Sequence, residues 1–85
     1  MRELFGRRLK KLRRKAGFSQ KELASILNVT ASTVSNYESG IYLPPLQTAY
    51  EIAINLHASL DYMTGLTGEE KYIKEPEVYI VAEEE

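Results

Sequence analysis

Residues 19–40 read SQKELASILNVTASTVSNYESG and contain the signals for two short helices joined by a tight turn. Ser19 and Glu22 form a capping box, in which each side chain bonds the other residue's backbone N–H and starts a helix. Asn28 predicts where this helix ends, because asparagine tolerates the left-handed backbone conformation better than most residues. The first helix is therefore expected over about residues 20–27.

The second helix of this stretch has an unusual exposed side. Thr30 is a good N-cap and Gly40 a good stop, which predicts a helix over about residues 31–39. If Val34 faces inward, a rotation of about 100° per residue places short, neutral, polar residues on the opposite side and its flanks. These residues are Ser32, Thr33, Ser35, Asn36 and Ser39. Solvated helix faces usually carry Lys and Glu instead.

These residue types suit the reading of DNA bases. Asparagine bonds adenine bidentately, serine and threonine bond several bases, and methyl groups contact thymine. Two short helices with a three-residue turn are also the geometry of a helix-turn-helix, whose second helix enters the major groove. The alternative is a plain helical hairpin whose polar face meets only water.

Three further helices are predicted around this pair. An apolar stripe at helical spacing predicts a helix over about residues 3–16, and a second stripe predicts a helix whose first turn contains Pro45. The stripes are Phe5, Leu9, Leu12 and Ala16, and then Leu46, Ala49, Ile52, Ala53 and Leu56. Ser59 caps a short fifth helix that ends at Gly65. The expected fold class is all-α, with five helices over about residues 1–65.

The charge is unevenly distributed, although the net charge is only −1. Residues 1–20 hold eight basic residues and one acidic residue, whereas residues 66–85 hold two basic and seven acidic residues. The basic stretch favours contact with DNA phosphates. A membrane-surface helix and a merely solvated helix face are the alternatives. A folded helix is preferred because Leu9 and Leu12 are needed for the core.

Enzymatic and metal-dependent functions are not expected. The chain has no cysteine and one histidine, His57, which excludes a thiolate metal site and a Cys–His pair. The glycines, Gly6 among them, are interpreted as caps and turns rather than as a phosphate-binding loop. No catalytic residue, metal or cofactor is therefore expected. No apolar run approaches the roughly 20 residues that span a bilayer, so a cytoplasmic protein is expected.

The acidic extension over residues 66–85 has a different character. Val78-Tyr79-Ile80-Val81 is a strand-like run by composition. A lone strand is not stable by itself, so this run must add to a strand, pack on the helices or stay disordered. Dimerisation and partner binding are the roles considered for it.

The chain resembles the phage repressor/Cro (XRE) helix-turn-helix family over residues 4–65. The resemblance lies in FGRRLKKLR (5–13), GFSQKELA (17–24), VTASTVSNYESG (29–40), Pro44 and SLDYM (59–63). It implies a five-helix domain that binds operator DNA as a two-fold dimer and regulates transcription. A repressor that binds a near-palindromic operator is therefore expected. An antitoxin-like or adaptor protein, whose tail binds a partner protein, is the alternative.

The resemblance also implies roles for individual residues. Gln20 matches a position that touches a phosphate and braces the recognition helix. Positions that face bases or adjacent phosphates are matched by Thr30, Ala31, Ser32, Thr33 and Asn36. Ser35 and Tyr37 match candidate contacts to the DNA backbone. The basic stretch, independently of the resemblance, offers Arg2, Arg7 and Lys10 as further candidates. Arg13 and Glu38 match a structural ion pair between the first and third helices.

The dimer surface is expected on the fifth helix and the tail. Its predicted members are Leu60, Tyr62, Met63, Leu66 and Tyr79. Three positions depart from the family. Asn28 stands where relatives usually have glycine in the turn. The loop after the third helix is Ile41-Tyr42-Leu43, where relatives often have basic residues. His57 replaces a frequent glycine, which predicts a left-handed backbone at that residue.

Overall fold

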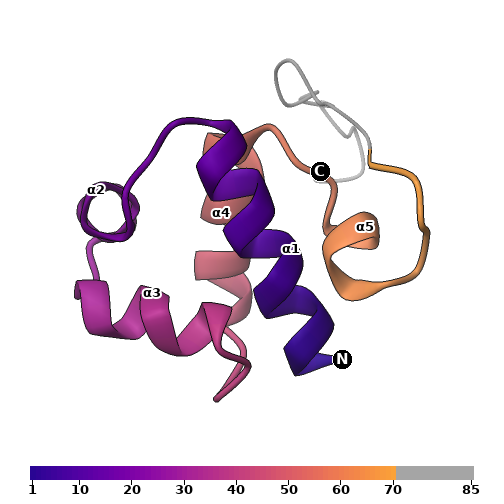
Figure 1. The fold of residues 1–85 in the computed structure, drawn as a ribbon, viewed down its shortest axis with the longest axis horizontal. Helices are drawn as coiled ribbons and strands as arrows, with labels where there is room; N and C mark the ends of the chain where they lie inside the picture. Colours follow the sequence, from indigo (N-terminus) through magenta and orange to yellow (C-terminus); the bar gives the residue numbers. More distant parts are fainter. Residues whose placement is uncertain (71–85) are drawn as a thin grey trace, which may run out of the picture.

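The computed structural model describes residues 1–70, and five helices follow one another in this part of the chain (Figure 1). They are α1 (Arg2–Lys15), α2 (Gln20–Leu27), α3 (Ala31–Glu38), α4 (Leu46–Leu56) and α5 (Leu60–Thr64). Within these residues no strand is present, which confirms the predicted all-α class. The strand-like run at Val78–Val81 lies outside the described residues. None of the five helices is long and apolar enough to cross a membrane.

The helix ends follow the local sequence signals. Both halves of the capping box are present, since the Glu22 N–H donates to Ser19 Oγ at 3.0 Å and the Ser19 N–H donates to Glu22 Oε1 at 2.8 Å. Asn28 and His57 both adopt the predicted left-handed conformation, with φ of 60° and 53°. Ser59 accepts a hydrogen bond from the Tyr62 N–H and caps α5. The short-range signals thus place the helix ends within a residue or two.

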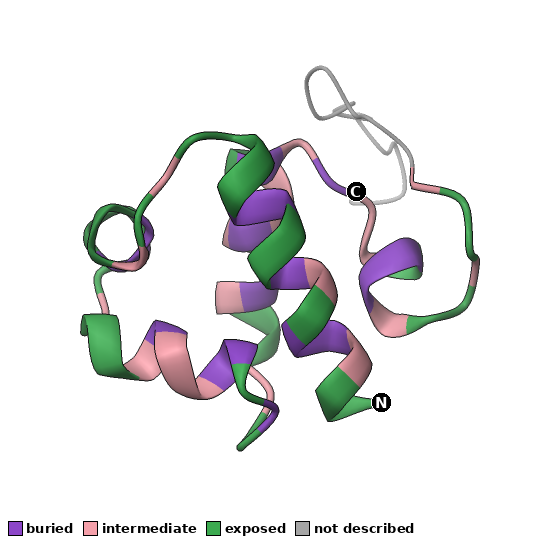
Figure 2. Cartoon of the chain, viewed as in Figure 1, coloured by how far each residue is buried: buried purple, intermediate pink, exposed green. Residues whose placement is uncertain are grey.

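One apolar core joins all five helices (Figure 2). Its buried side chains include Phe5, Leu9, Leu12, Leu23, Leu27, Val34, Ile52, Leu56 and Met63. Burial of each such side chain is worth about 1.5–3 kcal/mol relative to exposure. Because α1 packs against both α3 and α5, it links the helix-turn-helix pair to the rest of the domain.

The prediction for the start of α4 was wrong at Leu46. This side chain is 81% exposed, although it belongs to the predicted apolar stripe. Pro45 is the N-cap rather than a residue of the first turn, and Ala49 is the first buried residue of α4. The first turn of α4 therefore lies beyond the edge of the core.

Gly6 was also misinterpreted, because it is neither a cap nor a turn residue. It lies inside α1, where this helix crosses the C-terminal end of α3. A Cβ atom at this position would lie 2.6 Å from the Tyr37 carbonyl oxygen and closer still to that of Glu38. The absence of a side chain at Gly6 lets the two helix backbones touch.

Candidate nucleic-acid interface

Helices α2 and α3 form the predicted helix-turn-helix on one side of the molecule (Figure 1). The left-handed Asn28 turns the chain, and the Val29 N–H closes α2 by donating to the Ala24 carbonyl at 2.9 Å. Ala24 and Val34 are 2% and 0% exposed, so they fill the space between the two helices. The turn is thus fixed by backbone bonds and by burial.

The outward side of α3 is polar and uncharged. Ala31, Ser32 and Ser39 are exposed, while Thr33, Ser35 and Asn36 are half-buried. The Thr33 N–H donates to Thr30 Oγ1 at 3.1 Å, and the two threonine hydroxyls lie 2.9 Å apart. The first turn of α3 is therefore held by its own cap. The hydroxyl and amide groups on this side are of the kinds that can bond base edges.

A buried hydrogen-bonded network fixes the other end of α3. Arg13 Nε donates to Glu38 Oε2 at 2.5 Å, and Arg13 Nη2 donates to Glu38 Oε1 at 3.1 Å. The two side chains are only 8% and 3% exposed. Arg13 Nη1 also donates to the Phe18 carbonyl at 2.8 Å, and Gln20 Nε2 donates to Glu38 Oε1 at 2.9 Å. The predicted ion pair is present, and Gln20 braces α3 from the first residue of α2.

Tyr37 differs from its prediction as a DNA-backbone contact. Its side chain is 3% exposed and belongs to the core, because it follows the inward-facing Val34 by one helical turn. Burial raises the pKa of the Tyr37 hydroxyl above its ordinary value of 10.0. Tyr37 is therefore a structural residue of α3, and the exposed polar side lies elsewhere on the helix.

The cations of α1 divide into two groups. Arg8 donates to the Tyr62 and Thr67 carbonyls, while Lys11 and Lys15 pair with Glu70. The side chains of Arg7 and Lys10 are exposed and make no hydrogen bond or ion pair within residues 1–70, and the same holds for the side chains of Arg2 and Arg14. Arg7, Lys10 and Arg14 follow one another at i, i+3 and i+7, so they form one ridge. Sequence reasoning omitted Arg14, although this spacing identifies it.

The predicted dimer surface on α5 is largely buried within one chain. Tyr62 and Met63 are 6% and 0% exposed, because α5 packs its apolar side against α1. Leu60 is half-buried against the core, whereas Leu66 is 81% exposed. Tyr79 lies outside the described residues. Tyr62 and Met63 were therefore wrongly assigned to a surface, and Leu66 remains available.

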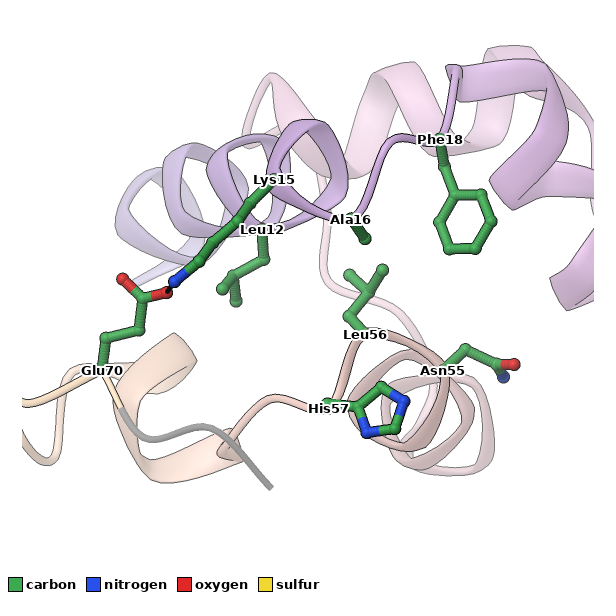
Figure 3. A pocket seen from close by; sticks show the side chains of 8 residues that line it. All are labelled: Leu12, Lys15, Ala16, Phe18, Asn55, Leu56, His57 and Glu70. Atoms are coloured by element: carbon green, nitrogen blue, oxygen red, sulfur yellow. Dashed lines mark hydrogen bonds and ion pairs between the residues drawn. The ribbon is translucent and has the colours of Figure 1, made fainter. Parts of the chain in front are cut away.

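A pocket of about 430 Å³ lies at the C-terminal end of α1 (Figure 3). Its lining includes Leu12, Phe18, Leu56 and His57, and the pair between Lys15 and Glu70 lies at its edge. Its residues come from α1, the α1–α2 turn, the end of α4 and the end of the described chain, and none belongs to α3. Within the described residues, no group of acidic or histidine side chains could hold a metal ion.

Comparisons with known proteins agree with this geometry. The sequence profile of the helix-turn-helix family matches residues 9–63, more than half of the chain. The chain is 40% identical over 60 residues to the HTH-type transcriptional regulator ImmR of Bacillus subtilis (strain 168). The aligned region covers 71% of this chain and 47% of ImmR. It is 37% identical over 60 residues to the SPbeta prophage-derived uncharacterized HTH-type transcriptional regulator YonR of the same organism, covering 71% of this chain and 56% of YonR. The chain thus spans about half the length of the curated relatives it matches.

Proposed function

Because this chain belongs to the helix-turn-helix family, we propose that it binds DNA sequence-specifically and regulates transcription. The full proposal is a repressor that binds a near-palindromic operator as a homodimer. Both relatives described above are named as transcriptional regulators, which supports the regulatory part of the proposal.

The observation that carries the proposal is the outward side of α3, which is polar, uncharged and rigidly held. Base reading requires donors and acceptors in fixed positions, since a good bidentate contact discriminates by about 1–3 kcal/mol. The cap at Thr30 and the network at Glu38 hold the two ends of the helix. A helix that only faced water would need neither an uncharged surface nor a buried ion pair to orient it.

The proposed roles follow from position on the elements. Ser32, Thr33 and Asn36 contact bases, with Ala31 and Ser35 beside them on α3. Gln20 and Thr30 contact phosphates, and the ridge of Arg7, Lys10 and Arg14 supplies positive charge for long-range attraction. Phosphate contacts set the register of α3 in the groove, and base contacts supply the specificity.

A homodimer would present two α3 helices about 34 Å apart, one turn of DNA. Leu66 is the exposed apolar member of the proposed dimer surface, and its other proposed members are the half-buried Leu60 and Tyr79 in the extension. Mixing two copies of different length and measuring the mass of their DNA complexes tests this stoichiometry. A complex that contains one copy on a single half-site would contradict the dimer.

Selection from a randomised duplex library with the full chain tests the function directly. The expected result is an enriched two-fold motif, with half-sites about one turn apart. Asn36→Ala should weaken binding to this motif far more than binding to random DNA. Asn55→Ala is the matched control, since Asn55 is an exposed asparagine on α4 that bonds the Glu51 carbonyl. Binding without any enriched motif would contradict sequence-specific recognition and favour the adaptor alternative.

A further inference from the structure

The loop after α3 places a tyrosine hydroxyl against the main candidate base-reading residue. Asn36 Nδ2 donates a hydrogen bond to the Tyr42 hydroxyl at 3.2 Å. The Tyr42 ring meets the Tyr37 ring edge-on, with centroids 5.6 Å apart and an interplanar angle of 81°. Because Tyr37 is 3% exposed and belongs to the core, it provides a fixed support for the Tyr42 ring.

This contact restricts what the Asn36 carboxamide can present. A carboxamide has one oxygen acceptor and two N–H donors, and its terminal torsion is soft. With one N–H donated to Tyr42, one N–H and the oxygen remain. This donor and acceptor complement N7 and the N6 amino group of adenine in the major groove. Guanine presents two acceptors there, N7 and O6, which a carboxamide oxygen cannot satisfy.

We propose that Tyr42 is a positioning residue that sets the base preference of Asn36 by holding its carboxamide in the orientation that selects adenine over guanine. The inference rests on the proposed DNA-binding function and adds a specificity determinant to it. Tyr42 touches no base in this proposal. It acts from the loop by fixing the direction of one side chain on α3. Without the hydroxyl, the Asn36 carboxamide rotates and its amino group can donate to guanine.

The test compares Tyr42→Phe with the wild-type full chain on the motif selected from the library. This substitution keeps the ring against Tyr37 and removes only the hydroxyl. At the base pair that depends on Asn36, the preference for A·T over G·C should fall about two- to tenfold, the effect of one hydrogen bond. Affinity for random DNA and its salt dependence should not change. Tyr50→Phe on α4 is the matched control, since Tyr50 is a 54% exposed tyrosine outside the helix-turn-helix.

A second measurement needs no DNA. In a ¹⁵N spectrum of the free protein, the Asn36 side-chain N–H signals should shift in Tyr42→Phe and exchange faster with water. The Asn55 side-chain signals serve as the internal reference. Unchanged Asn36 signals would overturn the proposed contact.

The outcomes separate this inference from the proposed function. A wild-type motif with an Asn36-dependent adenine, lost in part by Tyr42→Phe, supports both. A motif whose A·T preference is unchanged in Tyr42→Phe, or that has no Asn36-dependent position, overturns the inference and leaves the function standing. No motif for the wild type overturns the function, and this inference with it.

Discussion

The two flanks of α1 make ion pairs of similar length in very different surroundings. Toward α3, Arg13 meets Glu38 at 2.5 Å, and the side chains are 8% and 3% exposed. On the other flank, Lys11 and Lys15 meet Glu70 at 3.0 and 2.7 Å, with lysine side chains that are 59% and 66% exposed. Distance alone does not distinguish the two flanks, but burial does.

The comparison teaches which charges hold the fold and which only balance the surface. A buried pair that loses one partner leaves a charge without water or counterion, so its loss is costly. When an exposed pair loses one partner, water solvates the remaining charge, so little stability is lost. The flank toward α3 therefore orients α3, whereas on the other flank Glu70 offsets part of the positive charge of α1.

The largest expected effect comes from breaking the buried pair. Glu38→Ala should lower the free energy of unfolding by about 3–5 kcal/mol, because Arg13 stays buried without its counterion. Urea denaturation followed by circular dichroism measures this loss. The double variant Arg13→Met with Glu38→Leu is the matched control and should recover much of the stability. A loss below about 1 kcal/mol for Glu38→Ala would mean that water reaches Arg13, as at an exposed pair.

The second effect tests the close approach of α1 and α3. Gly6→Ala should destabilise the protein by about 1–3 kcal/mol, because the new methyl group meets the Tyr37 and Glu38 carbonyl oxygens. Helix propensity alone predicts that Gly6→Ala stabilises the protein, since alanine favours the helix over glycine by about 1 kcal/mol. Thermal unfolding of both variants measures the effect, with Gly68→Ala as control because no atom lies within 4 Å of its added Cβ. A stabilised Gly6→Ala would show that the helices separate easily.

Gly6 also illustrates what the sequence could and could not predict. The helix ends depend on neighbours within four residues, so Ser19, Asn28 and Thr30 were sufficient to place α2 and α3. The polar side of α3 followed from helical rotation about Val34. The need for glycine at position 6 depends on Tyr37 and Glu38, which lie more than 30 positions away in the sequence. No local signal distinguishes it from a turn glycine.

The same limit explains the error at the dimer surface and the contact in the loop that the sequence did not predict. A five-residue helix has too few positions for its periodicity to define a buried side, so Tyr62 and Met63 were placed on the surface. The bond between Asn36 and Tyr42 depends on the conformation of the loop after α3, which residue types alone do not determine. Arg13 and Glu38 were paired only through the family resemblance.

A smaller effect separates two adjacent arginines of α1. Arg8→Ala should cost about 1 kcal/mol of stability, because the guanidinium donates to backbone carbonyls and lies 4.1 Å from the Tyr62 ring centroid. Arg7→Ala should leave stability unchanged but weaken DNA binding and reduce its salt slope by about 1. Thermal unfolding and DNA titration at several salt concentrations measure the two quantities. Equal effects of both variants on stability would contradict the division of α1 into two groups of cations.

The smallest effect is expected at Glu70. Lys15 first and Lys11 second hold the pKa of this carboxyl below its ordinary value of 4.5. A lowered pKa means that the pair stabilises the folded state above about pH 4.5 and that this contribution disappears as the pH falls through the lowered value. Glu70→Gln should therefore lower the melting temperature slightly near neutral pH in dilute buffer, and this difference should shrink as the pH falls through the lowered pKa of Glu70 and in concentrated salt. Glu69→Gln is the control, because Glu69 makes no ion pair within residues 1–70. A loss of stability for Glu70→Gln as large as that for Glu38→Ala, or one that salt does not reduce, would mean that water is excluded from Glu70. The two flanks of α1 would then be equivalent, and burial would no longer explain which of them orients α3.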